Sequence, residues 1–194
     1  GESQPKADAQ TLALESFDYD LLLENLRFFP YLRELNLPRM KLTFQQLKEL
    51  QLAYPELSLG YTVALLDQEI SFEAIEADLS AMTSEDVEEV AAALPLLPNL
   101  QTVKLSDEEG NSALTVEEVH TLQEAAPELM LDYTFDLFGQ RISTTDERVE
   151  FHSKKIGDSK EQELRQALDI MKGCKYLLLE HCYLSDEVLA QLRD

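Results

Sequence analysis

The sequence is poor in the residues from which common active sites are built. Its 194 residues include three histidines, two cysteines and six glycines, all scattered along the chain. The histidines show no spacing typical of a metal cluster, and dispersed glycines exclude the glycine-rich loop that cradles phosphate groups. Two cysteines do not decide between an oxidising and a reducing compartment. We therefore expect no catalytic constellation, no metal site and no cofactor.

Positive charge and long apolar runs are also scarce. Sixteen lysines and arginines stand against 38 aspartates and glutamates, which gives a net charge of −22. Such a chain is repelled by phosphate backbones and anionic membrane surfaces, so nucleic acid is not an expected partner. No stretch approaches the roughly 20 apolar residues of a membrane helix, which predicts no transmembrane segment. The charge has two interpretations: a solvated acidic surface, or an acidic face that attracts a basic protein or a divalent cation.

What the chain does contain is an internal repeat. Residues 53–71 align without a gap to residues 125–143, and 11 of these 19 positions are identical. Average residue usage would give about one identity. The flanking sequence extends the pattern into about two and a half copies of a long repeat, over 11–75, 76–147 and 148–194. A polar, proline-containing segment, 1–10, precedes them and is typical of a linker.

Each complete copy is predicted to hold three strand-containing units. Amphipathic helices follow the first and second strands, and the third unit has a turn and an extended return instead of a helix. Capping boxes beginning at Thr43, Thr115 and Ser159 mark helix starts, while Pro55 and Pro127 mark helix ends. The predicted helices span 19–29, 44–54, 84–94, 116–126, 160–171 and 186–192.

Three segments carry a resemblance to a known family. They are Leu32-x-x-Leu35-x-Leu37, Leu100-x-x-Val103-x-Leu105 and Cys174-x-x-Leu177-x-Leu179. Each resembles the Leu-x-x-Leu-x-Leu core of leucine-rich repeats, and the strand centres lie 19 to 28 residues apart, close to the spacing in that family. The asparagine that normally follows the strand is missing, and every third unit lacks a helix. The chain is therefore similar to an irregular leucine-rich repeat, of the long-repeat type found in secreted or surface-attached bacterial proteins.

The resemblance implies an α/β fold with one domain over residues 11–194. We expect a right-handed β-α superhelix, a leucine-rich-repeat-like solenoid, with a parallel sheet on the concave face and helices on the convex face. A strand–helix unit buries its apolar side only by stacking on its neighbours, and right-handed crossovers produce a parallel sheet. The alternative is a compact doubly wound sheet, but its strands should be continuous apolar runs, and here they alternate.

The alternation predicts which side chains lie on the open face of the sheet, where solenoids usually bind their partners. Tyr176 and Leu178 suggest a contact patch, unless the C-terminal part of the chain covers them. Glu180 continues their alternation. The candidate binding residues are Glu34, Asn36, Asp78, Thr102, Lys104, Asp132, Glu150, His152, Tyr176 and Leu178.

Two other clusters have simpler interpretations. The loop around Asp107 fails as a calcium-binding EF-hand, because the first and last ligand positions would be apolar, although a looser cation site stays open as an alternative. Cys174 occupies a core position and is expected to be buried. His181 and Cys182 are adjacent, so in an extended chain they should point to opposite sides rather than form a base and a nucleophile.

The function that follows is a non-catalytic protein- or ligand-binding module of a secreted or surface-associated bacterial protein. The expected partner is another protein, and the negative net charge of the chain is compatible with a basic partner. One alternative is an acidic inhibitor of a basic enzyme that works by electrostatic complementarity. A more distant alternative is a hydrolase with its site at His152 and Glu150. The expected location is extracellular or at the cell surface.

Overall fold

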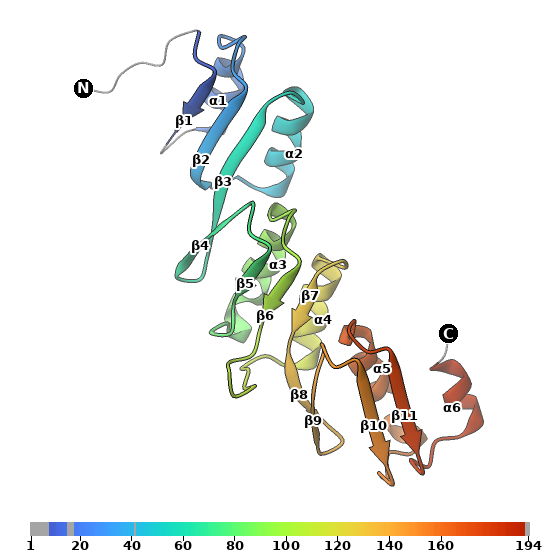
Figure 1. The fold of residues 1–194 in the computed structure, drawn as a ribbon. Coiled ribbons are helices and arrows are strands. Elements are labelled where there is room, and N and C mark those ends of the chain that lie inside the picture. Colours follow the sequence, from blue (N-terminus) through green and yellow to red (C-terminus); the bar gives the residue numbers. More distant parts are fainter. Residues whose placement is uncertain (1–7, 15–17, 41, 193–194) are drawn as a thin grey trace. The chain divides into compact units, whose positions relative to one another are not determined.

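The computed structural model describes residues 8–14, 18–40 and 42–192 (Figure 1). These residues fall into two compact units. The first unit comprises residues up to 74 together with 92–100, and the second unit comprises 75–91 together with residues from 101 onward. The predicted linker, 1–10, lies mostly outside the described residues.

The helices form where apolar periodicity and capping residues predicted them. Capping boxes at Thr43 and Thr115 are confirmed, with each hydroxyl accepting from the third helical amide. The predicted cap at Ser159 is wrong, because a short 3₁₀ turn, Asp158–Lys160, leads into the helix without a side-chain cap. The helices are α1 (Tyr19–Leu26), α2 (Phe44–Ala53), α3 (Val87–Ala93), α4 (Val116–Ala125), α5 (Glu161–Ile170) and α6 (Asp186–Gln191).

The first unit contains one four-stranded mixed sheet. Its strands are β1 (Thr11–Ala13), β2 (Glu34–Met40), β3 (Ser58–Leu65) and β4 (Gln68–Ser71). The first three pair in parallel, and β4 returns antiparallel to β3. Alternate residues of β2, Leu35 and Leu37, are fully buried. The buried hydroxyl of Tyr61 on β3 donates to the Leu96 carbonyl at 2.7 Å.

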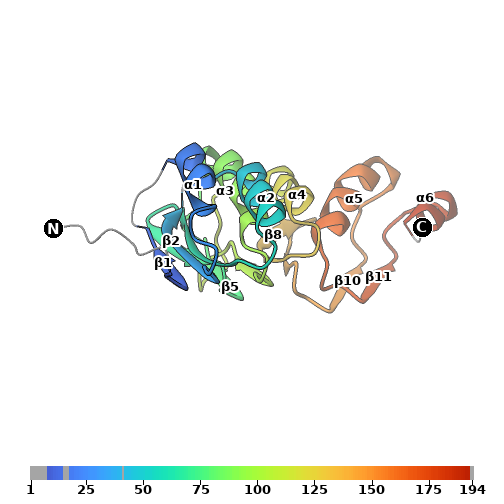
Figure 2. The same cartoon turned by 90° about the horizontal axis from the view of Figure 1, so that it is seen from above.

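The second unit contains three separate sheets. Its strands are β5 (Glu76–Asp78), β6 (Thr102–Lys104), β7 (Met130–Asp132), β8 (Thr134–Leu137), β9 (Gln140–Ser143), β10 (Arg148–His152) and β11 (Tyr176–Glu180). Strands β5, β6 and β7 form a parallel sheet, β8 and β9 form an antiparallel hairpin, and β10 and β11 form a parallel pair. Helices α4 and α5 pack together on one side of these strands (Figure 2). The strand residues Val103, Leu131 and Phe151 are buried, as are Val119 and Leu122 of α4 and Leu164 and Ala167 of α5.

The predicted β-α superhelix with one parallel sheet is wrong. The described residues form four small sheets of mixed, parallel and antiparallel kinds, and none of them is closed or continues as a solenoid. The helix-free third units are the physical reason. Strand β4 occupies the second edge of β3 over Thr62–Leu65, so that edge is not available to a further parallel strand.

The equivalent edge beyond β7 is closed by a side chain. The buried hydroxyl of Thr144 donates to the Leu131 carbonyl and accepts from the Tyr133 amide at 2.9 Å. Thr144 also donates its own amide to the Tyr133 carbonyl at 2.9 Å. These bonds satisfy the Leu131 carbonyl and both backbone groups of Tyr133, through which β7 would pair with a next strand, so the parallel sheet ends at β7.

The duplicated segments form the two hairpins. Their turns lie at residues 66–67 and 138–139, one residue before the positions 67–68 and 139–140 that the sequence predicts. In the second hairpin the turn residues Phe138 and Gly139 have φ values of 53° and 73°. Positive φ at both central residues is the condition for a type I′ turn, which suits the twist of a two-residue hairpin. Leu66, at the position of Phe138, has a φ of 52°. The internal repeat therefore encodes a strand and its return.

Candidate functional site

The exposed side chains of β10 and β11 form the most concentrated group of candidate residues. In this parallel pair Arg148 lies opposite Tyr176, Glu150 opposite Leu178, and His152 opposite Glu180. Alternate residues of both strands point to the same side, away from the core residues Val149 and Phe151. We call this surface the β10–β11 face; it consists of Arg148, Glu150, His152, Tyr176, Leu178 and Glu180.

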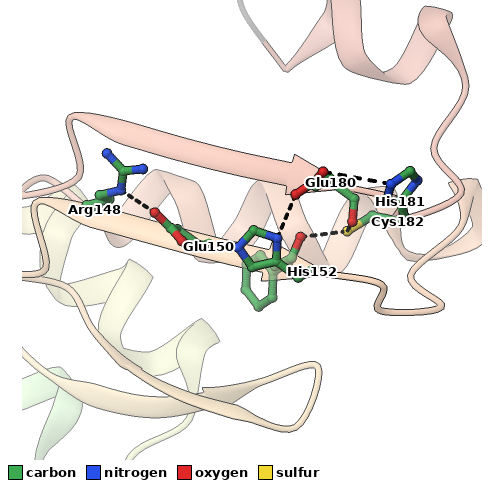
Figure 3. Close-up of polar contacts among 7 residues, drawn as sticks. Arg148, Glu150, His152, Glu180, His181 and Cys182 are labelled. Carbon is green, nitrogen blue, oxygen red and sulfur yellow. Dashed lines mark hydrogen bonds and ion pairs between the residues drawn. The ribbon is translucent and has the colours of Figure 1, made fainter.

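His152 lies between two carboxylates on this face (Figure 3). Its Nδ1 is 2.8 Å from Oε2 of Glu180, and its Nε2 is 3.1 Å from Oε2 of Glu150. Both partners only accept hydrogen bonds when ionised, so both bonds form when the ring is the doubly protonated imidazolium. The hydrogen bonds to Glu150 and Glu180 accordingly raise the pKa of His152 above its ordinary value.

The charges of the face are paired with one another. Arg148 forms an ion pair through its Nε with Glu150, whose other carboxylate oxygen faces His152. His152, and after it Arg148, lower the pKa of the Glu150 carboxyl. Arg148 and His152 thus alternate with Glu150 and Glu180 across two strands. The charges of the face balance when His152 is protonated, although the chain as a whole carries −22 with its histidines neutral.

Apolar side chains lie beside this charged row. Tyr176 is 65% exposed and Leu178 is 40% exposed, so neither is covered by the helix that follows, α6. An aromatic and an aliphatic side chain on an open strand face, next to paired charges, resemble the apolar centre and polar rim of a protein–protein contact. The arrangement can bind a partner surface through Tyr176 and Leu178 while the charged row orients it.

The chain bends sharply where β11 ends. His181 and Tyr183 have positive φ values of 55° and 59°, which are uncommon for bulky residues. Between them Cys182 turns inward and donates its thiol to the Phe151 carbonyl at 3.2 Å, while the exposed His181 ring lies 3.7 Å from Glu180 (Figure 3). The expectation that His181 and Cys182 point to opposite sides is confirmed.

The two cysteines are free and differ in burial. Cys182 is buried, whereas Cys174 is only half-buried. The expectation of a buried thiol at Cys174 is wrong, although the repeat places this residue at a leucine position of the core.

The other predicted binding residues do not join the β10–β11 face. In the first unit, Asn36 donates its side-chain amide to Glu34 at 2.9 Å. On the sheet of β5, β6 and β7, Lys104 lies 3.7 Å from Asp78, and Asp132 accepts from Ser143 at 3.4 Å. Thr102 precedes Lys104 by two residues on β6 and shares its face. The ten predicted residues therefore lie on three separate sheets rather than in one row.

Arg148 is not among the predicted binding residues, because the apolar pattern of the sequence predicts a strand over 149–151, whereas the observed strand begins at Arg148. Extending the alternation of Glu150 and His152 by two positions towards the N-terminus would have found it. Within the described ranges, no group of three or more histidine, cysteine, aspartate or glutamate side chains could hold a metal ion. The Asp107 carboxylate accepts from the Glu109 and Asn111 amides at 2.9 and 2.7 Å, which makes it a loop-closing residue.

The first unit has a hollow of its own that the sequence did not predict. It has a volume of about 310 Å³ and lies between the C-terminal ends of α1 and α2. Leu26, Phe29 and Tyr54 line it together with Arg27 and Glu56. Among the described residues, no helix is long and apolar enough to cross a membrane.

No protein-family model, no curated protein and no solved structure matches this chain. The resemblance to leucine-rich repeats therefore stays a prediction from the residues of its strands.

Proposed function

We propose that this chain is a non-catalytic protein-binding module and that the β10–β11 face is its contact surface. The observation that carries the proposal is the exposure of Tyr176 and Leu178 beside a row of paired charges. Tyrosine is enriched among the residues that dominate binding energy, and an exposed aromatic next to an aliphatic side chain provides the apolar centre of such a contact. The binding partner in this proposal is another protein.

The geometry of His152 supports a binding role over the hydrolase alternative. A general base needs a ring nitrogen that can accept a proton. Here both nitrogens lie within hydrogen-bond distance of carboxylates, which raise the pKa of the ring and so favour its protonated form, in which neither nitrogen can accept a proton. The thiol of Cys182 is buried against the Phe151 carbonyl, away from this ring, so it is not placed to act as a nucleophile with His152.

The pairing of charges also separates this proposal from the acidic inhibitor. Electrostatic mimicry needs unpaired negative charge at the contact, whereas Glu150 and Glu180 are both engaged by His152. We therefore expect that association with the partner depends weakly on salt, because the Debye length of about 8 Å at physiological ionic strength already screens the distant acidic groups. A steep fall of the association rate with added salt would favour the inhibitor instead.

The predicted extracellular or cell-surface location belongs to the same proposal. It rests on the polar residues 1–10 and on the resemblance to secreted and surface-attached proteins. Fractionation of the source cells with an antibody against this chain would test it. Recovery from the cytoplasm alone would contradict the predicted location but not the proposed binding role.

Site-specific photo-crosslinking tests the contact surface. A benzophenone amino acid replaces Tyr176 in one variant and Tyr31 in a matched control, since these two tyrosines are 65% and 66% exposed. We expect a discrete crosslinked protein from position 176 and not from position 31, and a loss of that product when Leu178→Asp is added. Equal products from both positions, or none from position 176, would contradict the proposed surface.

A further inference from the structure

The hollow of the first unit lies between two helices whose spacing is fixed by side chains. The Tyr19 hydroxyl on α1 donates to the Gln46 carbonyl on α2 at 3.0 Å. The Tyr54 hydroxyl, at the end of α2, donates back to the Leu23 carbonyl on α1 at 3.3 Å. These bonds hold α1 beside α2 near the start and at the end of α2. The hollow at the C-terminal ends of the two helices is therefore preformed, as sites for small molecules usually are.

The second copy of the repeat builds the same backbone at the equivalent place. In both copies, two amides near the helix ends donate to the carbonyl three residues earlier, at 3.0 or 3.1 Å. The donors and acceptors are Phe29 with Leu26, Leu57 with Tyr54, Leu97 with Leu94, and Leu129 with Ala126. The residues that line the hollow can therefore be compared with the second copy position by position.

Three of the ten lining residues differ between the two copies, and the other seven are identical. The three are Arg27, Phe29 and Tyr54, and their counterparts are Pro95, Leu97 and Ala126. The second copy shows that this backbone forms without the two aromatic rings and the positive charge. These three side chains are therefore not required by the fold, and they are the ones that change what the hollow can bind.

The lining combines apolar rings with two opposite charges. Phe29 and Tyr54 are half-buried, whereas Arg27 and Glu56 are exposed. The Arg27 guanidinium lies over the ring of Phe28, 4.9 Å from the ring centroid. A guanidinium that is stacked in this way keeps the N–H groups at its edge available for a carboxylate.

Both charges are without an ionic partner in the described part of the chain, since no ion pair there includes Arg27 or Glu56. The hollow also lies at the C-terminal ends of two helices, where the helix dipoles favour a positively charged group. It therefore offers a guanidinium to an anion, and a carboxylate together with two helix ends to a cation.

We propose that this hollow binds a free α-amino acid with an apolar side chain. The side chain of the ligand lies against Phe29 and Tyr54, its carboxylate pairs with Arg27, and its ammonium group pairs with Glu56. Such a ligand is neutral overall, so the net charge of −22 does not repel it as it would repel a simple organic anion. The volume of about 310 Å³ suits this size, because ligand pockets span about 300–1,000 Å³.

The hollow is independent of the β10–β11 face, because all of its lining residues belong to the first unit. Other occupants would carry only one of the two charges. The C-terminus of a peptide has no ammonium group beside its carboxylate, and the N-terminus of a peptide has no carboxylate beside its ammonium group. Derivatives of one amino acid therefore distinguish a free amino acid from the end of a chain.

Calorimetric titration of the intact chain with L-phenylalanine and L-leucine tests the site. Three comparison ligands each lack one feature: N-acetyl-L-phenylalanine has no ammonium group, L-phenylalanine amide has no carboxylate, and glycine has no apolar side chain. We expect saturable binding of phenylalanine and leucine, with a dissociation constant of about 1 mM or below. Each comparison ligand should bind about tenfold more weakly or worse, because it loses a charged hydrogen bond or the apolar contact.

Two variants assign the charges. Arg27→Gln should weaken the binding of phenylalanine about tenfold and abolish its preference over phenylalanine amide. Glu56→Gln should abolish the preference over N-acetyl-phenylalanine. The matched control is Arg33→Gln, since Arg33 is exposed, does not line this hollow, and has Gln101 as its counterpart in the second copy. The control should change the affinity by less than about twofold.

A lack of saturable binding for both amino acids would overturn the inference. Equal affinities for phenylalanine and either of its derivatives would also overturn it, and would indicate the end of a chain as the ligand. An equal effect of Arg27→Gln and Arg33→Gln would show that the hollow is not the site. The series of ligands uses the unaltered chain, so its result does not depend on the folding of a variant.

Discussion

Replacement of Thr144 by valine is expected to destabilise the second unit strongly, although it exchanges only one non-hydrogen atom. Valine has nearly the same shape as threonine, and a methyl group takes the place of the hydroxyl. That hydroxyl is fully buried and bonds two backbone groups, the Leu131 carbonyl and the Tyr133 amide. Neither group gains another partner on substitution, because both lie against the closed edge of β7.

The size of the effect follows from these two bonds. A buried backbone group left without a partner costs about 1–3 kcal/mol, and burial of the added methyl group offsets about 1 kcal/mol. Since two groups lose their partner, we expect Thr144→Val to lower the free energy of unfolding by about 1–5 kcal/mol. Thr144→Ser keeps the hydroxyl and should cost about 1 kcal/mol through the lost methyl group.

Equilibrium unfolding in urea, followed by far-ultraviolet circular dichroism, measures the difference. Thr145→Val is the matched control, because Thr145 is exposed and its hydroxyl bonds only Ser143 at 2.8 Å. Exposed substitutions of this kind usually change stability by less than about 0.5 kcal/mol. If Thr144→Val were no more destabilising than Thr145→Val, the hydroxyl would not be what closes the edge of β7, and the explanation for the separate sheets would be wrong.

Two further predictions concern the titration of the face and the repeated tyrosines. His152 should titrate above its ordinary pKa in proton NMR, and Glu180→Gln should lower that pKa. A histidine whose pKa is raised in the folded state stabilises the fold below its unfolded-state pKa, and this stabilisation is lost as the pH rises through the folded-state pKa. His152→Gln should therefore lower the urea midpoint more at pH 6 than at pH 9. Equal effects at both pH values would contradict the ion-pair geometry. Tyr61→Phe and Tyr133→Phe should each cost about 1–2 kcal/mol, since each removes a 2.7 Å hydrogen bond from a buried hydroxyl to a carbonyl, of Leu96 and Leu114 respectively. Urea unfolding of both variants checks this, and a large effect at only one site would show that the two repeat positions are not equivalent.

The local structure was largely predictable because it depends on residues close in sequence. Apolar spacing and capping hydroxyls place α2 and α4 within one residue of their predicted ends, since a helix is decided by bonds within the segment. The parallel pairing of β1 with β2 and of β5 with β6 also follows from a strand–helix–strand order. In the same way, alternation correctly placed Glu150, His152 and Tyr176 on one exposed face of neighbouring strands.

The sheet topology was not predictable from the same pattern. Alternation says which side of a strand is buried but not which edge is paired. At equivalent positions of the two hairpins the chain has Phe72 and Thr144, and both donate their amides to the equivalent tyrosine carbonyls, at 3.1 and 2.9 Å. Only Thr144 adds a hydroxyl that satisfies the edge of β7. Edge closure thus depends on backbone groups and on one side chain that the repeat does not conserve between its copies.

The half-burial of Cys174 has a related cause. Its place in the Leu-x-x-Leu-x-Leu pattern predicts a core position, and that prediction presumes a covering strand beyond β11. In the described chain the leucines that follow, Leu177 and Leu179, are half-buried as well. The sequence of one copy determines which side chains of its strand can be buried, but whether these side chains are buried depends on the presence of a neighbouring strand.

Amide hydrogen exchange along β11, resolved by NMR, tests the central claim most directly. In the free chain we expect the amides of Leu177 and Leu179, which point to the open edge, to exchange quickly, while that of Val103, the counterpart of Leu177 on β6, is protected by β7. Protection of both leucine amides would contradict the sheet order in which β11, among the described residues, pairs only with β10.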